Sequence, residues 1–324
     1  MIFSDLLSIA RRYIGNRSLA RIRRIAYVIP REVRTPHVSS GTLITVLTVP
    51  IRQLGESERA AVEQILDRDP YAGAQIAERV ASHGLNWWRA DGRIYGYGSS
   101  RRVESLCWSG AHLVPVCATP AAVAAYADLL GAEPRICSSI IGRADAVLAL
   151  WDRLGGHWGP ARDVRPHQPL LVADTEPPIP ADPDVRLVRP NEIDQLFPAA
   201  VAMYTEEVGV SPLLDDGGRG YRRRITELVR GKRAYARFVD GRVIFKAELA
   251  IVTHRTTQVQ GVWMDPDWRG RGLAAGAMAA VVQDALRRVA PTVSLYVNDY
   301  NTPARRVYAR CGFASAGAFA TVLF

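Results

Sequence analysis

Residues 262–275 have the sequence VWMDPDWRGRGLAA, which is the most informative stretch of the 324-residue chain. A β-branched, strand-like run ends at Asp265-Pro266, and Arg269-Gly270-Arg271-Gly272 then leads into an Ala-rich run with helical spacing. Glycines let the backbone approach a ligand, and the first amides of a helix have no intrahelical acceptors. Because a helix N-terminus also carries partial positive charge, the stretch predicts a pyrophosphate-binding loop, to which Arg269 and Arg271 add charge.

The pattern Gly270-x-Gly272-x-x-Ala275 also matches the dinucleotide-binding pattern G-x-G-x-x-G/A. In that pattern the strand runs directly into the first glycine, and an acidic residue follows about twenty positions later. Here five residues separate the strand from the first glycine, and residues 289–292 contain no acid. The chain also ends too early for a second mononucleotide-binding half, so a dinucleotide site is not expected.

A second block lies about thirty residues further on, where residues 295–313 have the sequence LYVNDYNTPARRVYARCGF. Together the two blocks resemble the GNAT N-acetyltransferase superfamily, which combines an R/Q-x-x-G-x-G/A loop with a closing pattern of strand, Asn, Ala, Tyr and Gly-Phe. The resemblance covers residues 184–324. The matching positions are Arg269, Gly272, Ala274, Asn301, Ala304, Tyr308, Gly312 and Phe313.

The resemblance implies an α/β chain with a mixed sheet, the GNAT acyl-CoA N-acyltransferase fold. It also implies acetyl-CoA as co-substrate, in a gap where two parallel strands separate, here residues 259–264 and 293–297. No metal is implied. The implied acetyl-CoA contacts are the backbone of Val262, Trp263 and Met264 for the pantetheine arm, the loop Arg269, Gly270, Arg271, Gly272, Leu273 and Ala274 for the pyrophosphate, and Asn301 and Arg305.

Tyr308 is the predicted general acid, because a phenol within reach can protonate the departing CoA thiolate. Taken by itself, it would be interpreted as a packing residue on an amphipathic helix, and the context of Asn301 and Gly312-Phe313 favours the catalytic role. Asn301 could bind pantetheine or cap the helix that starts near Thr302, and both remain open. Arg305 could contact a CoA phosphate or be solvated. Cys311 is expected to be a buried small residue, since direct attack by an amine needs no cysteine nucleophile.

The general base is less well defined by the sequence. An amine must lose its proton before attack, and a carboxylate acting directly or through water usually accepts it. The candidates by topology are Glu206, Glu207 and Glu248, followed by His254 and Asp265. Each could instead be a solvated surface residue.

The first half of the chain repeats the order of predicted elements without the loop. Helices, a hairpin, a strand, a helix, a strand and a helix are expected in both halves, which suggests a tandem fold with a degenerate N-terminal copy. Where the repeat would place the loop, residues 117–122 have the sequence CATPAA, with no glycine or arginine. Residues 174–184, DTEPPIPADPD, contain four prolines and are the predicted linker. The predicted divisions are therefore 1–40, a basic extension; 41–173, a degenerate GNAT-like or accessory α/β domain; 174–184, the linker; and 185–324, the acetyltransferase domain.

The charge of the chain is concentrated at its start. Residues 1–40 hold eight arginines against Asp5 and Glu32, so they account for +6 of the net charge of +9, and nucleic acid is not an expected partner of the nearly neutral remainder. No apolar run approaches the ~18 residues of a membrane span. The four cysteines have no paired spacing, so neither a disulfide scaffold nor a zinc site is expected, and we expect a cytoplasmic location.

These patterns predict an acetyl-CoA-dependent N-acetyltransferase that moves an acetyl group to a primary amine by direct attack through a tetrahedral intermediate. The amine could belong to a small molecule or a protein, and the sequence does not distinguish them. The alternative is a non-catalytic acyl-CoA-binding sensor or scaffold module.

Overall fold

The computed structural model describes residues 50–86, 91–99, 101–214 and 216–324. The predicted extension 1–40 lies outside these residues, as does the β-branched run 42–49, whose composition predicts a strand. The described chain forms two halves that repeat one order of elements, β-α-α-β-β-β-α-β-α-β. The first half contains β1 (Ile51–Gln53), α3 (Arg59–Arg68), α4 (Ala74–His83), β2 (Gly92–Ser99), β3 (Arg102–Gly110), β4 (His112–Val116), α6 (Pro120–Gly131), β5 (Ser139–Arg143), α7 (Ala144–Trp158) and β6 (Asp163–Ala173). The second contains β7 (Arg186–Leu187), α8 (Ile193–Val208), α9 (Arg219–Arg230), β8 (Ala234–Val239), β9 (Arg242–Val252), β10 (Thr257–Met264), α10 (Leu273–Arg288), β11 (Val293–Tyr296), α11 (Thr302–Arg310) and β12 (Ala314–Leu323). The predicted α/β class and the tandem repeat of one order of elements are confirmed.

All the strands belong to one sheet with the order β1-β2-β3-β4-β5-β12-β6-β11-β10-β9-β8-β7. Two neighbouring pairs are parallel, β4 with β5 and β10 with β11, and they occupy equivalent places in the two halves. The other neighbours are antiparallel.

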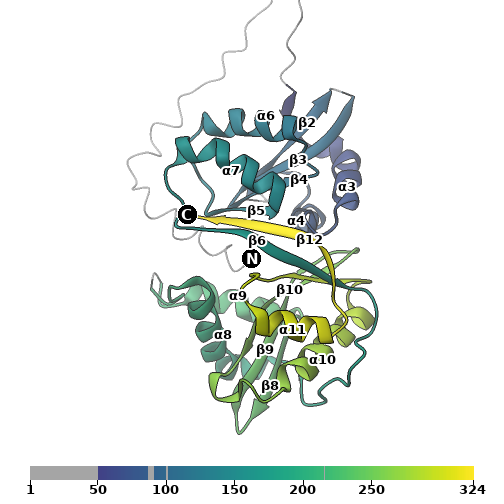
Figure 1. Ribbon diagram of the computed structural model, residues 1–324, viewed down its shortest axis with the longest axis vertical. Coiled ribbons are helices and arrows are strands. Elements are labelled where there is room, and N and C mark those ends of the chain that lie inside the picture. The colour runs from purple at the N-terminus through teal and green to yellow at the C-terminus, as the bar shows by residue number, and fades with distance from the viewer. Residues whose placement is uncertain (1–49, 87–90, 100, 215) are drawn as a thin grey trace, which may run out of the picture.

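The last strands of the two halves are exchanged. β6, from the first half, pairs with β11 of the second half, and β12, from the second half, pairs with β5 of the first. β6 and β12 also pair with each other, and Figure 1 shows them as two long strands that cross between the two halves. The C-terminal Phe324 accordingly packs edge-on against Trp151 and Trp158 of α7. Each half therefore needs a strand from the other to complete its sheet.

Helices cover both faces of the sheet. In the second half, α10 and α11 pack on one face over β8–β11, while α8 and α9 pack on the other. In the first half, α6 and α7 cover one face, which includes residues of β12, and α3 and α4 cover the opposite face. In the described part of the chain, no helix has the length and apolar character needed to cross a membrane.

The Pro-rich segment 174–184 contains no helix or strand and is anchored along α10. Asp182 donates its backbone amide to the Gly276 carbonyl at 2.9 Å, and its carboxylate pairs with Arg237 at 2.6 Å. Glu176 pairs with Arg287 at 2.8 Å. The connection between the halves is thus fixed by its own contacts.

Three local patterns in the sequence can be compared with the structure. Asp240-Gly241 predicts a tight hairpin turn, and it joins β8 to β9 with positive φ at both residues (49° and 76°), as a primed hairpin turn requires. The pattern of residues 69–80 predicts a helix, but α4 begins only at Ala74, because Asp69 accepts a hydrogen bond from the Ala72 amide and pairs with Arg143. β6 was absent from the sequence prediction, and its two prolines explain why.

Candidate functional site

The strands β10 and β11 separate soon after they begin. They pair only through Thr257 with Val293 and Gln258 with Ser294. Beyond this point the register of β10 against β9 shifts between Gln260 and Trp263, so β10 carries a bulge at Gly261, whose φ is +58°. The backbone of residues 262–264 therefore has no pairing partner in β11, as the predicted acetyl-CoA gap requires.

The loop before α10 leaves its last backbone amides without hydrogen-bond acceptors in the described chain. Asp265 caps a short turn by accepting a hydrogen bond from the Asp267 amide at 3.0 Å. Gly270 and Gly272 follow with φ of +74° and +77°, and Gly272 is the N-cap of α10. A Cβ added at either glycine would meet nothing within 4 Å, and none of the amides from Gly270 to Ala274 has an acceptor among the described residues. This open helix N-terminus fits a pyrophosphate.

The two arginines of the loop differ in their contacts. Arg269 turns back, donating to the Met264 carbonyl at 2.9 Å and pairing with Glu206 at 2.7 Å. It thereby closes the 264–269 turn. Arg271 lies over the ring of Trp268, with its guanidinium carbon 4.8 Å from the ring centroid. Arg271 has no ion pair among the described residues, so of the two loop arginines it is the one available to a phosphate.

The equivalent helix of the first half has a closed N-terminus. α6 begins at Pro120, which has no amide hydrogen, and the Thr119 hydroxyl accepts a hydrogen bond from the Ala122 amide at 3.3 Å. No glycine precedes it, and Cys117 adopts a φ of +53°. The first half therefore lacks the anion-binding feature of the second.

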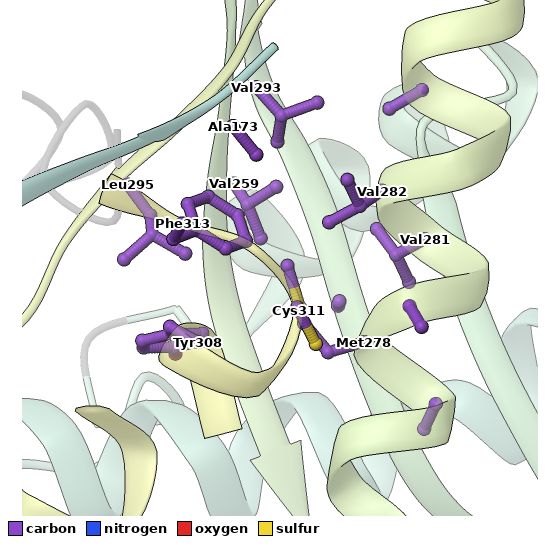
Figure 2. Close-up of a cluster of buried hydrophobic side chains, with 14 of the residues drawn as sticks. Ala173, Val259, Met278, Val281, Val282, Val293, Leu295, Tyr308, Cys311 and Phe313 are labelled. Atoms are coloured by element: carbon purple, nitrogen blue, oxygen red, sulfur yellow. The ribbon is translucent and has the colours of Figure 1, made fainter. Parts of the chain in front are cut away.

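Tyr308 lies on α11 inside the core between α10, α11 and the separating strands (Figure 2). Its residue is 6% exposed, and its ring meets Phe313 edge-on with 5.7 Å between centroids. Burial, with a smaller contribution from the charge of Glu207, raises the pKa of Tyr308. Burial thus favours the neutral phenol, and within the described chain its hydroxyl makes no hydrogen bond, so its proton is uncommitted.

The neighbours of Tyr308 on α11 serve other purposes. Asn301 accepts a hydrogen bond from the Ala304 amide at 3.2 Å, which is the helix-capping alternative. Arg305 donates to the Asp299 carbonyl at 3.0 Å and lines an open groove of about 500 Å³ between α11 and β6. Cys311 is fully buried, donates to the Ala275 carbonyl, and has a pKa raised by burial to about 11, which suits a packing role.

The candidate bases lie in three different environments. Glu248 is 1% exposed and bound by Lys246 at 2.6 Å and Arg224 at 3.2 Å. Burial works against its charge, but these two cations lower its pKa, so the buried, doubly paired carboxylate is unsuited to accept a proton from a substrate. Glu206 accepts hydrogen bonds from Trp263 and Arg269, and the hydrogen bond from Arg269 lowers its pKa.

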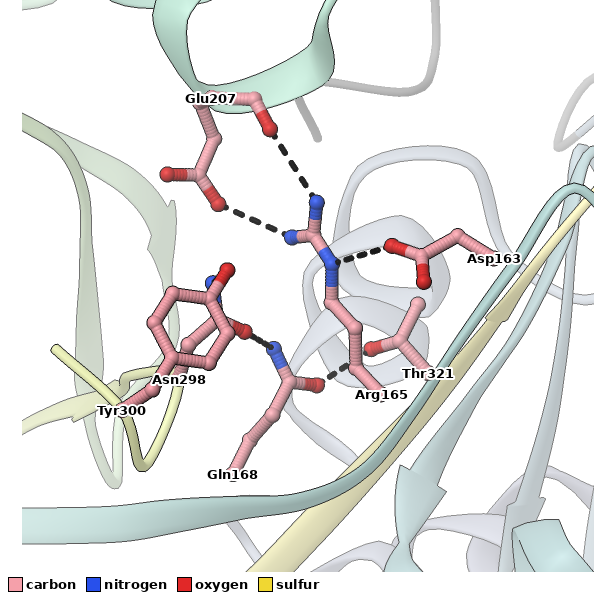
Figure 3. A network of polar contacts seen from close by, with 7 residues as sticks. All are labelled: Asp163, Arg165, Gln168, Glu207, Asn298, Tyr300 and Thr321. Atoms are coloured by element: carbon pink, nitrogen blue, oxygen red, sulfur yellow. Dashed lines mark hydrogen bonds and ion pairs between the residues drawn. The ribbon is translucent and has the colours of Figure 1, made fainter.

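Glu207 remains exposed at the end of α8, close to the exchanged strands (Figure 3). Arg165 of β6 donates to its carboxylate at 3.0 Å and to its backbone carbonyl at 3.1 Å. Beside this contact, Gln168 of β6 bridges Asn298, which follows β11, and Thr321 of β12. The sequence analysis missed Arg165 and Gln168 because it did not predict β6.

The remaining candidates, His254 and Asp265, are also engaged. His254 faces Asp67 at 3.3 Å, and Asp265 is buried and paired with Arg242 at 2.7 Å. The structure therefore places the open loop directly after the strand that borders the gap, with Tyr308 in the core beside that strand and Glu207 exposed at the end of α8. Glu248, His254 and Asp265 are each paired with a charged neighbour.

Two family models match the chain. Residues 198–313 match the acetyltransferase (GNAT) family, and residues 92–196 match a domain of unknown function, DUF4081. No curated protein matches the chain.

Solved structures resemble nearly the whole chain at low sequence identity. A Drosophila protein is 14% identical with a TM-score of 0.60, over 85% of this chain and 98% of its own. A GNAT-family acetyltransferase from Colwellia psychrerythraea is 12% identical with a TM-score of 0.50, over 85% and 99%. A GCN5-related N-acetyltransferase from Sphaerobacter thermophilus is 15% identical with a TM-score of 0.51, over 84% and 94%. These similarities extend the shared fold over both halves.

Proposed function

We propose, from the premise that residues 198–313 belong to the GNAT acetyltransferase family, that the chain transfers an acetyl group from acetyl-CoA to a primary amine. The observation that carries the proposal is the open helix N-terminus at Gly270–Ala274 beside the separating strands. The amides of this loop would hold the pyrophosphate with Arg271, and the backbone of residues 262–264 would pair with the pantetheine arm. Only the second half has these features, so one cofactor site per chain is proposed.

Tyr308 is the proposed general acid. Its phenol keeps its proton because burial raises its pKa, and no neighbour in the described chain competes for that proton. A neutral donor of this kind can protonate a departing thiolate.

Glu207 is the proposed base, because its carboxylate is exposed and its charge contributes to the raised pKa of Tyr308. Glu206 is less suited, since Arg269 lowers its pKa and weakens it as a proton acceptor. Arg165 holds Glu207 in place from the exchanged strand β6, so residues of both halves would face the acceptor amine.

Thermal unfolding of the full chain with and without acetyl-CoA tests the cofactor site. A ligand at a hundred times its Kd adds about 2.7 kcal/mol to the free energy of unfolding, a rise in melting temperature of roughly 5 °C for a chain of this size. Gly272→Val should abolish the rise, because a side chain would enter the space left for pyrophosphate. Gly241→Val is a matched control: its φ is also near +76°, and a Cβ there also meets nothing within 4 Å.

Both variants should lose stability by a similar amount, about 1–3 kcal/mol for a left-handed Val, but only Gly272→Val should lose the response to acetyl-CoA. A full response in Gly272→Val would exclude the loop assignment. A panel of primary amines, with free CoA thiol as the readout, then separates the enzyme from a sensor. Binding of acetyl-CoA without thiol release beyond the amine-free rate would favour the sensor.

A further inference from the structure

Three charged side chains lie buried between β9 and α9. Lys246 is 0% exposed, Glu248 1% and Arg224 6%. The Glu248 carboxylate lies 2.6 Å from the Lys246 Nζ atom and 3.2 Å from Arg224, so two cations share one anion and a positive charge is left over. Apolar side chains of similar volume would make an equally stable core, so burial of this cluster needs another reason.

Among the described residues, the Lys246 Nζ atom makes one hydrogen bond outside the cluster, and its acceptor lies in the bulge of β10. Its Nζ atom donates to the Gly261 carbonyl at 3.0 Å. A Cβ at Gly261 would lie 3.0 Å from this Nζ, 3.1 Å from Met203 Cε and 3.2 Å from Glu248 Cδ, and φ there is +58°. Both the backbone conformation and the crowding require glycine, so the bulge is built against the ammonium group.

The opposite side of the same peptide faces away from the ammonium. The described chain contains no cis peptide bond, and in a trans peptide the carbonyl and the amide hydrogen point in opposite directions. The Val262 amide therefore points away from Lys246, in the segment of β10 that has no partner in β11. A cation hydrogen-bonded to the carbonyl polarises the peptide and strengthens its amide as a donor.

We propose that Lys246 is a positioning residue that fixes and polarises the Gly261–Val262 peptide, so that the Val262 amide stabilises the thioester oxygen during acyl transfer. Glu248 holds the ammonium in place, and Arg224 is paired with the other carboxylate oxygen of Glu248. In the transfer the amine nitrogen bonds to the carbonyl carbon, the carbon–sulfur bond breaks, the amine proton passes to the base and the thiolate takes the Tyr308 proton. The inference rests on the proposed function, because negative charge develops on that oxygen only in such a transfer.

The test is infrared spectroscopy of acetyl-CoA labelled with carbon-13 at the carbonyl and bound to the full-length protein. A donor at the thioester oxygen lowers the carbonyl stretching frequency. In the wild-type protein the frequency should lie below that of free acetyl-CoA. Lys246→Met should move it back toward the free value, while the Kd for acetyl-CoA changes by less than about threefold.

Turnover with the best amine of the panel provides the second readout. Loss of a whole oxyanion donor costs about 10²–10³-fold in kcat. Because Lys246 acts on the Val262 amide only through the carbonyl of the same peptide, we expect Lys246→Met to lower kcat by roughly tenfold with KM little changed.

Arg224→Met is the matched control. It removes the other cation of the same cluster and, like Lys246→Met, leaves one cation paired with Glu248, so both variants should fold. Arg224→Met keeps the bond from Lys246 to Gly261 and should leave both frequency and kcat near the wild-type values.

An unshifted carbonyl in the wild-type protein would overturn the inference without any variant. Equal effects of the two variants would also overturn it, since they would indicate a general packing role for the cluster. If the wild-type protein does not bind acetyl-CoA, the proposed function is overturned as well. If the wild-type protein acetylates the amine but Lys246→Met changes neither the carbonyl frequency nor kcat, the inference alone is overturned.

Discussion

The substitution Tyr308→Phe separates chemistry from packing at one position. Phe keeps the buried ring and its edge-on contact with Phe313 and removes a hydroxyl that has no hydrogen-bond partner in the described chain. The free energy of unfolding should therefore change by no more than about 0.5 kcal/mol. Loss of a general acid costs about 10²–10⁴-fold in rate, which corresponds to about 2.7–5.4 kcal/mol of activation free energy.

The assay compares kcat from thiol release, the Kd of acetyl-CoA and the midpoint of urea unfolding. Tyr126→Phe is the contrasting variant, because the Tyr126 hydroxyl is buried in the first half and bonded to Ser105 at 3.0 Å. It should lose about 1 kcal/mol of stability and keep its kcat. Unchanged turnover in Tyr308→Phe would refute Tyr308 as the acid, and a parallel loss of acetyl-CoA binding would assign the hydroxyl to cofactor positioning.

The pH profile of the wild-type enzyme tests the same residue independently. Ionisation of the phenol would remove the acid, and burial raises the pKa of Tyr308 above its ordinary value of about 10. Loss of activity through this group is thereby moved to higher pH. Between pH 7 and 9 kcat should not fall through ionisation of Tyr308, and a falling limb in this range that disappears in Tyr308→Phe would contradict the raised pKa of the phenol.

Three further outcomes follow from the structure. Val322→Ala changes a fully buried residue of β12 and should lower the free energy of unfolding of the whole chain by about 2 kcal/mol. Urea unfolding, monitored by Trp fluorescence, should keep a single transition. Separate transitions for the two halves would argue against coupling through the exchanged strands. The hydrogen bond from Arg186 lowers the pKa of Glu192. The stability that this ion pair contributes is therefore present above about pH 4.3 and is lost as the pH falls through the folded-state pKa. Glu192→Gln should reduce the fall in unfolding free energy that is measured over this acidic range. Deletion of residues 1–40 should lower the isoelectric point and leave acetyl-CoA affinity and kcat unchanged, and a large loss of soluble active protein would show that the segment docks onto the fold.

The sequence predicts well what is local in this protein. The loop before α10 is defined by glycines with positive φ and by a helix start, and the Asp240-Gly241 turn by two residues that tolerate positive φ. Both signals lie within a few adjacent residues. The resemblance to the GNAT family depended on the same kind of local pattern.

What the sequence did not reveal depends on distant partners. β6 contains Pro166 and Pro169, which argue against a strand, and its place between β11 and β12 is decided by pairing with residues more than 100 positions away. Glu248 was considered as a base because nothing local shows that Arg224 would pair with it. One signal was available: Lys246 and Glu248 lie two residues apart in an otherwise apolar strand, which places opposite charges on one buried face.

The exchange of β6 and β12 has a consequence for synthesis on the ribosome. The first half is translated first, but β12, the strand that covers the edge of β5, is made after all the other described elements. At 5–20 residues per second, the β5 edge waits about 10–30 s while roughly 170 further residues are made. During that interval the nascent chain presents an unpaired strand edge and the apolar surface that Ala320 and Val322 later cover. Because such an edge pairs readily with other chains, we expect newly made chains to depend on chaperone binding until β12 is released.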